Sequence, residues 1–168
     1  YNCASYLTTA LDSVFSQKYA NIEVIVIDDG STDNSYETAK KYNHGIILHQ
    51  QENKGPAAAR NHGVSIASGE FIAFLDCDDL WLANKLNTQI EYLLDHPETG
   101  ISFGNFCCWS PDKHGQYPPT ESFATSISHA IEHDLSGWID LQGRSGSNLG
   151  AGVFKSQKGG YNAEQTTR

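Results

Sequence analysis

Positive charge is scarce in this sequence. Its 168 residues contain 11 Lys and Arg against 20 Asp and Glu, which gives a formal net charge of −9. A nucleic-acid-binding protein needs a basic surface to displace counterions from phosphates, so this composition excludes general nucleic-acid binding. No apolar run approaches the ~20 residues that a membrane span requires. Methionine is also absent, and a sequence without an initiator that enters a helical pattern just after Tyr1 is expected to be a fragment.

Cysteine is sparse as well. The four cysteines are Cys3, Cys77, Cys107 and Cys108, and no two of them are spaced as C-x-x-C. That spacing marks zinc sites and thioredoxin-like motifs, so neither is indicated. Cys107 and Cys108 lie in an apolar run, where buried free thiols are expected. Reduced cysteines fit a cytoplasmic location, which we expect here, with the inner face of the membrane as an alternative.

Strand-like and helix-like patterns alternate along the first part of the chain. Apolar runs predict strands at residues 24–27, 46–48, 71–75 and 101–109. Helical spacing of apolar residues, with capping and turn residues, predicts helices at residues 5–15, 35–42, 55–67 and 80–96. The last helix is expected to carry one apolar stripe of Leu82, Leu86, Ile90, Leu93 and Leu94. This alternation predicts an α/β fold with a mainly parallel sheet.

The pattern weakens after Trp109. Proline and glycine mark a loop over residues 111–119, and a helix is expected from Ser122 to about Leu135. Residues 143–152 contain four glycines and are expected to form a loop. The letters HAIEH at residues 129–133 match the H-x-x-E-H pattern of some zinc proteases, but an ordinary amphipathic helix is the preferred interpretation of so short a motif.

Carboxylates follow two of the predicted strands. Asp28 and Asp29 come after the first strand, and Asp76, Asp78 and Asp79 come after the third. The carboxyl ends of parallel strands share one edge of the sheet, and ligands bind in the crevice there. Acidic groups gathered on one edge repel one another unless a cation lies between them, and Mg2+ and Mn2+ prefer oxygen ligands. The residues therefore predict a metal-assisted site for a phosphorylated ligand.

Each acidic segment has a simpler interpretation on its own. Asp, Gly and Ser are ordinary turn residues, so residues 28–31 would form a turn and a helix cap. A D-x-D triplet such as residues 76–78 occurs often by chance. Two such segments, each directly after a buried strand, favour the site.

Three segments, in their order and spacing, resemble family 2 glycosyltransferases. They are residues 22–33 (IEVIVIDDGSTD), 53–63 (NKGPAAARNHG) and 67–79 (ASGEFIAFLDCDD). Tyr1 and Asn2 resemble the Tyr-Asn that follows the first strand of that family, and residues 159–164 (GGYNAE) resemble it more weakly. The resemblance implies a GT-A fold, with a Rossmann-like, mainly parallel sheet flanked by helices. From the resemblance, we expect that the family's first strand and C-terminal part are not included in this sequence.

The resemblance also implies how the chain is divided and what it does. Residues 1–109 would form the donor-binding half, and residues 110–168 would begin the acceptor-binding half of the same domain. A sugar would pass from a nucleotide-diphosphate sugar, most often a UDP-sugar, to a hydroxyl of a glycan or lipid-linked acceptor, with inversion. The family's catalytic base is expected beyond Arg168, so no residue of this sequence is named for that role.

The donor-site roles follow from the same resemblance. Asp29 would bind the donor base, and Asp28 would support that loop. Lys54 and Arg60 would lie beside the diphosphate, although Arg60 has the alternative of being an ordinary surface residue of its helix.

The metal-site roles also follow from the resemblance. Asp76 and Asp78 match the D-x-D motif, in which Asp78 would bind Mn2+ or Mg2+ directly. Asp76 would contact the ribose or the metal shell. Such a metal stabilises the charge that develops on the leaving diphosphate.

The sequence is also compatible with two other functions. A non-catalytic nucleotide-sugar-binding domain would use the same donor residues. A sugar nucleotidyltransferase would also share the sheet and the metal site, but its Gly-rich, basic loop is not evident near the start of this sequence.

Overall fold

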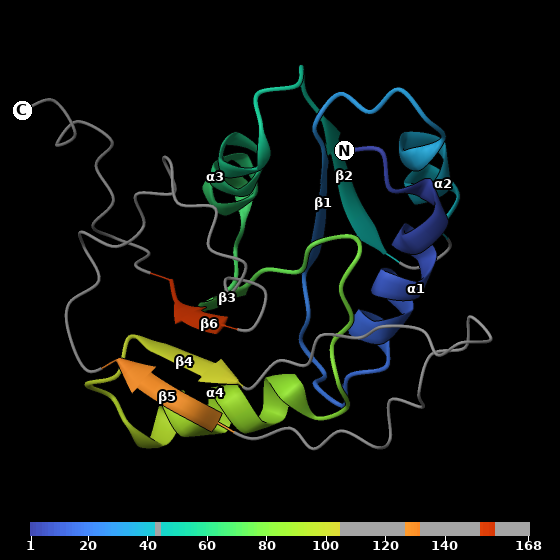
Figure 1. Ribbon diagram of the computed structural model, residues 1–168. Coiled ribbons are helices and arrows are strands. Elements are labelled where there is room, and N and C mark those ends of the chain that lie inside the picture. The colour runs from blue at the N-terminus through green and yellow to red at the C-terminus, as the bar shows by residue number, and fades with distance from the viewer. Residues whose placement is uncertain (43–44, 105–126, 132–151, 157–168) are drawn as a thin grey trace, which may run out of the picture.

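The computed structural model describes residues 1–42, 45–104, 127–131 and 152–156. Helices and strands alternate along this part of the chain (Figure 1). Their order is α1 (Ala4–Phe15), β1 (Val24–Asp28), α2 (Ser35–Lys41), β2 (Ile46–Gln50), α3 (Pro56–Ile66), β3 (Phe71–Ala73), α4 (Lys85–Asp95), β4 (Ile101–Gly104), β5 (Ile127–Ile131) and β6 (Gly152–Lys155).

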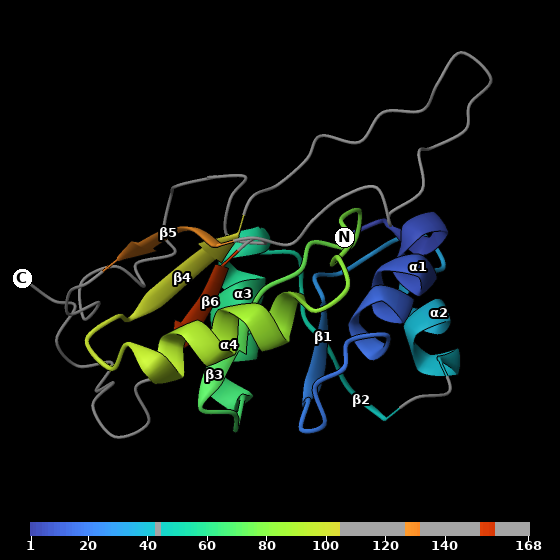
Figure 2. The same cartoon turned by 90° about the horizontal axis from the view of Figure 1, so that it is seen from below.

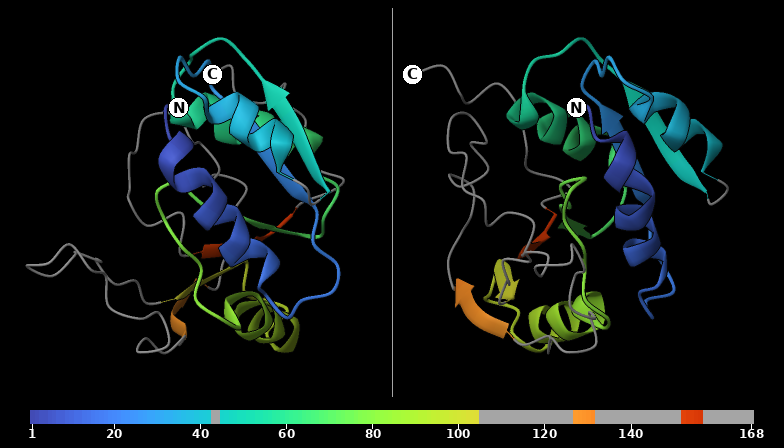
Figure 3. Two further views of the ribbon diagram at one scale, coloured as in Figure 1. Left: turned by 90° about the vertical axis from the view of Figure 1, so that its right-hand side faces the viewer. Right: turned by 45° about the vertical axis from the view of Figure 1, so that its right-hand side comes forward.

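The strands form two separate sheets. β1 and β2 pair in parallel, with Val24 opposite Ile46 and Asp28 opposite Gln50. The second sheet has the order β3-β6-β4-β5, and its pairs are antiparallel. Because β3 and β4 both run antiparallel to β6, they are parallel to each other. α1 and α2 lie on one face of the β1–β2 pair, and α3 lies on the other (Figures 1 and 3).

Two predictions for the last third of the chain are wrong where the structure describes it. Residues 127–131, expected in a helix, form β5, which pairs with β4 so that Ile131 lies opposite Ile101. Pairing with a formed strand outweighs local helical spacing, and Ile suits a strand. His129 lies in β5, so the helical face on which the H-x-x-E-H pattern depends is not formed there. Gly152, expected in a loop, begins β6. Residues 105–126, 132–151 and 157–168 lie outside the described part, and the second half of the proposed domain division lies largely there.

One core joins the two sheets. Apolar residues of α1, Val24 of β1 and apolar residues of α4 belong to one core cluster. Figure 2 shows these three elements from below. The apolar stripe of α4 is narrower than predicted, because Leu94 is 58% exposed and Leu82 precedes the helix. Asn84 adopts the left-handed conformation at the N-cap, so α4 begins only at Lys85. No helix in the described part is long and apolar enough to cross a membrane.

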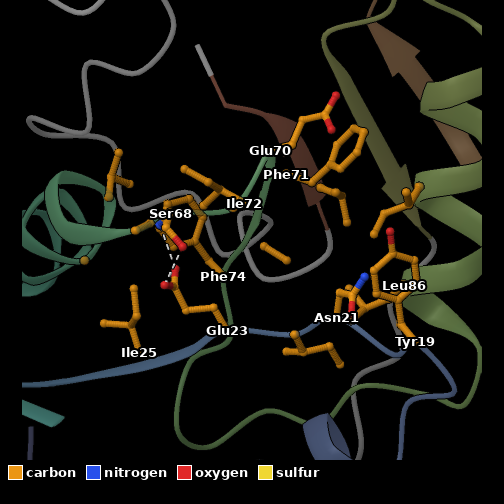
Figure 4. A pocket seen from close by; sticks show the side chains of 18 of the residues that line it. Tyr19, Asn21, Glu23, Ile25, Ser68, Glu70, Phe71, Ile72, Phe74 and Leu86 are labelled. Carbon is orange, nitrogen blue, oxygen red and sulfur yellow. Dashed lines mark hydrogen bonds between the residues drawn. The ribbon is translucent and has the colours of Figure 1, made fainter. Parts of the chain in front are cut away.

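A cavity of about 730 Å3 separates the two sheets. Its walls include Ile25 of β1, Ile72 of β3 and Phe74, and Figure 4 shows these side chains lining it. At the amino ends of the strands, the carboxylate of Glu23 accepts hydrogen bonds from the N–H and the hydroxyl of Ser68, at 2.7 and 2.6 Å. Within the described residues, β1 pairs only with β2 and β3 only with β6. The edges of β1 and β3 that face this cavity are therefore unpaired there.

Candidate functional site

The loop after β1 packs closely against the loop after β2. Asp28, at the end of β1, is 5% exposed, and its carboxylate accepts hydrogen bonds from the Ser31 N–H at 3.3 Å and the Gln50 amide at 2.9 Å. Gly30 has a φ of 71°, and a Cβ on it would lie 2.8 Å from the backbone nitrogen of Asn53. Only glycine fits both that conformation and that contact. The hydrogen bonds of Asp28 are those of a residue that supports the loop.

Asp29 holds the loop after β2 in place. Its carboxylate is 4% exposed and accepts hydrogen bonds from the N–H groups of Lys54 at 3.0 Å and Gly55 at 2.8 Å. The side-chain amide of Gln51 donates a third, at 2.7 Å. Burial acts to raise the pKa of Asp29, but these three hydrogen bonds outweigh it and lower the pKa below its usual value. A carboxylate has about four acceptor positions, so one remains on Oδ2.

The N-terminal part of α3 and the residue before it form hydrogen bonds with both the loop after β1 and the loop after β3. Gly55, whose N–H binds Asp29, directly precedes the first residue of α3. Arg60, in the first turns of the same helix, donates from Nη2 to both carboxylate oxygens of Asp76, at 2.7 and 2.9 Å. The Arg60 side chain is 18% exposed and that of Asp76 is 43% exposed. Asp29 and Asp76 are therefore both bound by the segment from Gly55 to Arg60, Asp29 at its start and Asp76 at its end. Arg60 forms an ion pair with Asp76 and is only partly exposed.

The loop after β3 carries unbalanced negative charge. Asp78 and Asp79 are exposed, and the N–H of Asp79 donates to the carbonyl of Asp76 at 3.0 Å, which closes a turn. Although Asp79 is exposed as a residue, partial desolvation of its carboxylate raises its pKa, and the charges of Asp78 and Asp76 raise that pKa further. A cation beside this turn would relieve that repulsion, and carboxylate oxygens suit Mg2+ and Mn2+.

A metal at this turn would need ligands beyond these side chains. In the part of the chain that the structure describes, no three His, Cys, Asp or Glu side chains are grouped to hold a metal ion. Asp76 and Asp78 would offer two carboxylates at most, and both oxygens of Asp76 already accept hydrogen bonds from Arg60. Such a pair fits an ion that takes its other ligands from water and substrate phosphates, as Mg2+ usually does. The exposed Lys54 side chain lies on the neighbouring loop.

Sequence reasoning missed one residue that organises the site, Gln51, and gave no structural role to a second, Asn2. Gln51 bridges Asp29 and His62, whose Nδ1 lies 2.8 Å from the Gln51 side-chain oxygen. It directly follows β2, so the rule that polar residues at strand ends share one edge would have found it. Asn2 accepts a hydrogen bond from the Thr32 N–H at 2.9 Å and donates its own N–H to the Ser31 hydroxyl at 2.9 Å. Tyr1 and Asn2 thus lie beside the loop after β1.

Known proteins resemble this chain over a little more than 60% of its length. UDP-Glc:alpha-D-GlcNAc-diphosphoundecaprenol beta-1,3-glucosyltransferase WfaP of Escherichia coli is 38% identical over 108 residues, covering 63% of this chain and 43% of that protein. Glycosyltransferase GlyA of Streptococcus pneumoniae serotype 4 is 38% identical over 109 residues, covering 63% of this chain and 16% of that protein. The chain thus spans less than half of each of these relatives.

Two solved structures share the fold. A mannosyltransferase from Pyrobaculum calidifontis, in complex with GDP-Man and Mn2+, matches with a TM-score of 0.57 and 31% identity, over 60% of this chain and 32% of that one. TarS 1-349 of Staphylococcus aureus, in complex with UDP, matches with a TM-score of 0.55 and 30% identity, over 60% of this chain and 31% of that one. These likenesses confirm the predicted α/β fold of the GT-A type.

The family match is broader than any of these single likenesses. The sequence model described as glycosyl transferase family 2 matches residues 1–146, which is most of the chain. The predicted resemblance is therefore confirmed, and the chain belongs to glycosyl transferase family 2.

Proposed function

We propose that this chain carries the donor-binding half of an inverting glycosyltransferase that uses a UDP-sugar and a divalent metal. The observation that carries the proposal is the link made by α3. The Gly55 N–H just before the helix binds Asp29, and Arg60 within it binds Asp76. A single helix end thus fixes the spacing of the acidic loops that follow β1 and β3. A nucleoside diphosphate, with a base at one end and phosphates at the other, suits two such loops.

Each part of the donor has a group to meet it. The remaining acceptor position on Asp29 Oδ2 suits a ring N–H of the base, such as that of uracil. Asp78 and Asp76 would hold Mn2+ or Mg2+, and that ion would stabilise the negative charge that develops on the leaving diphosphate. Arg60 and the exposed Lys54 supply positive charge beside the same phosphates. The base that deprotonates the acceptor hydroxyl is not assigned to a described residue.

The relatives support the choice of donor and acceptor classes. TarS 1-349 has been solved in complex with UDP and with UDP-GlcNAc. The E. coli relative is named for a UDP-Glc donor and a diphosphoundecaprenol-linked acceptor. We extend these classes to the present chain and propose a UDP-sugar donor with a glycan or lipid-linked acceptor. An acceptor of the second kind would bring the protein to the inner face of the membrane.

Calorimetric titration of UDP into the chain, with Mn2+ and with EDTA, tests the proposal. We expect binding that requires Mn2+ and that weakens at least tenfold in Asp78→Asn. Asp95→Asn is the matched control, since Asp95 is an exposed acid at the end of α4. Binding that survives EDTA, or that Asp78→Asn leaves unchanged, would contradict the metal assignment. The absence of UDP binding with Mn2+ would overturn the donor assignment for this chain.

A further inference from the structure

A half-buried glutamine joins Asp29 to a histidine of α3. The Gln51 backbone is fixed just after β2, because its N–H donates to the carbonyl of Asp28 at 2.9 Å. Its side-chain nitrogen donates to Asp29 Oδ1 at 2.7 Å, and its side-chain oxygen lies 2.8 Å from Nδ1 of His62. Gln51 and His62 are half-buried, and Asp29 is buried. The three side chains therefore form one continuous line from the acidic loop to the helix.

The charge of Asp29 fixes the orientation of the other two side chains. Although burial acts in the opposite direction, hydrogen bonding lowers the pKa of Asp29, so its carboxylate is ionised at neutral pH and only accepts hydrogen bonds. The end of the Gln51 amide that faces Asp29 is therefore the NH2 group, and the end that faces His62 is the oxygen. Because that oxygen only accepts, Nδ1 of His62 carries a proton. In neutral His62, Nε2 is then the unprotonated nitrogen.

The His62 ring is itself held in place by its surroundings. It belongs to α3 and packs edge to face against the ring of His49 in β2, with centroids 5.4 Å apart and an angle of 74° between the ring planes. α3 begins directly after Gly55, whose N–H donates to Asp29. The helix therefore acts on Asp29 twice, once through the residue before its first turn and once through His62 and Gln51.

We propose that His62 is a positioning residue for the donor base, which acts on Asp29 through Gln51. This inference rests on the proposed function, in which Asp29 binds the base. The Nδ1–H of His62 keeps the Gln51 oxygen turned toward α3 and thereby directs the Gln51 NH2 group at Asp29. Oδ1 of Asp29 is then occupied by Gln51 and the Lys54 N–H, and Oδ2 accepts from the Gly55 N–H. The one remaining acceptor position on Oδ2 has a fixed direction, which suits a base that donates a ring N–H, such as uracil.

Loss of the proton donor on His62 would free the Gln51 side chain to turn. An amide whose oxygen has no partner can exchange its two ends, and an oxygen turned toward the Asp29 carboxylate would be repelled by it. Asp29 would then keep its two backbone hydrogen bonds and lose the third. We expect UDP to bind roughly three- to tenfold more weakly, the effect of about one hydrogen bond. The metal end of the candidate site, at Asp78, does not depend on this line of side chains.

The first experiment determines which nitrogen of His62 carries the proton. Long-range 1H–15N correlation spectra are recorded at about pH 8, where a histidine with the usual pKa of about 6.5 is neutral. The His62 signals are assigned from their loss in His62→Asn. We expect the Nδ1–H form in the wild type and a shift toward the Nε2–H form in Gln51→Leu, which removes the acceptor of that proton. The Nε2–H form in the wild type would overturn the proposal, because the Gln51 oxygen would then have to face Asp29.

The second experiment measures the affinity for UDP and for inorganic pyrophosphate, each titrated with Mn2+. His62→Leu removes the proton donor, and we expect UDP to bind it roughly three- to tenfold more weakly. His62→Asn places an NH2 group near the position of Nδ1, so we expect it to bind UDP nearly as the wild type does. Pyrophosphate has no base and should bind to all three chains equally. His49→Leu is the control, since it removes the ring beside His62 and leaves the hydrogen bond between His62 and Gln51.

The other outcomes of these titrations would contradict the proposal. UDP affinity in His62→Leu equal to that of the wild type, or a loss in His62→Asn as large as in His62→Leu, would show that the proton donor does not act on Asp29. A parallel loss of UDP and pyrophosphate affinity would assign His62 to the stability of the fold and not to the base. If the wild type binds no UDP, the donor assignment of Asp29 fails and the positioning role fails with it, while the spectra still decide how Gln51 is oriented.

Discussion

Asp29 gives the sharpest test of how the site is held together. Replacing it by Ala removes the acceptor of two backbone N–H groups, those of Lys54 and Gly55, and of the Gln51 amide. Each backbone donor left without a partner costs about 1–3 kcal/mol. Water reaches the exposed Lys54 more easily than Gly55, so we expect Asp29→Ala to lose about 2–4 kcal/mol of unfolding free energy.

A second variant, Asp29→Asn, should lose less unfolding free energy than Asp29→Ala. Asp29→Asn keeps the shape of the side chain and one acceptor oxygen. Its best orientation keeps the oxygen at Oδ1, facing Lys54 and Gln51, and turns the amide NH2 toward the Gly55 N–H. One hydrogen bond of the three is then lost, so we expect about 1–2 kcal/mol. Asp95→Ala, with the same change of charge on an exposed helix end, is the control and should stay within about 0.5 kcal/mol of the wild type.

The effect should also depend on pH in one direction. Because the pKa of Asp29 is lowered in the folded chain, its contribution is present above the usual value of 3.8 and is lost as the pH falls through the folded value. Urea unfolding, followed by tryptophan fluorescence at pH 7 and at several lower pH values, measures the loss at pH 7 and its decrease as the pH falls below 3.8. An Asp29→Ala variant as stable as the wild type at pH 7 would refute the account of this loop.

Two further predictions concern the packing around the site and the core. Gly30→Ala should lower the free energy of unfolding, measured in urea, by about 2–4 kcal/mol, because φ is +71° and the new Cβ meets the Asn53 nitrogen. Gly45→Ala is the control, since nothing lies within 4 Å of a Cβ added there. Equal losses of stability in the two variants would contradict the argument. Lys85 is 7% exposed, and burial lowers its pKa from 10.5 to about 7, so its cost to folding is complete below pH 7 and disappears as the pH rises toward 10.5. Lys85→Met should therefore stabilise the chain by about 1–3 kcal/mol at pH 6, a gain that is limited because the hydrogen bond to Gln89 is lost as well. The gain should be smaller at pH 9, where part of the cost of the buried charge has already disappeared. Urea unfolding at the two pH values measures both gains, and a gain that does not shrink at pH 9 would contradict this prediction.

The sequence allowed most of the fold before Gly104 to be predicted, because its signals are local. The apolar run before Asp28, the proline at the start of α3 and the spacing of Leu7, Leu11 and Val14 each concern neighbours in the chain. β5 and β6 were not predicted, because short strands take their stability from partners far away in sequence. The spacing of Ile127 and Ile131 fits a helix until β4 is available to pair with them.

The site residues also differ in whether the sequence alone predicts their positions and partners. The positions of Asp28 and Asp29 at the end of β1 follow from the order of elements along the chain. The partner of Arg60 does not, since only the packing of α3 shows that its guanidinium lies against Asp76. The roles assigned to the six predicted donor and metal residues stay predictions until binding is measured.

The edges of β1 and β3 that have no partner among the described residues have a consequence for how the chain behaves at high concentration. Open strand edges beside an apolar cavity can pair with strands of other copies, which is a common route to aggregation. The net charge of −9 keeps copies apart near neutral pH. That repulsion fades as the seven histidines, and then the first carboxylates, take up protons between about pH 7 and pH 5. The same acidity that suits the chain to a metal-bound donor therefore also sets the range of pH over which it stays dispersed.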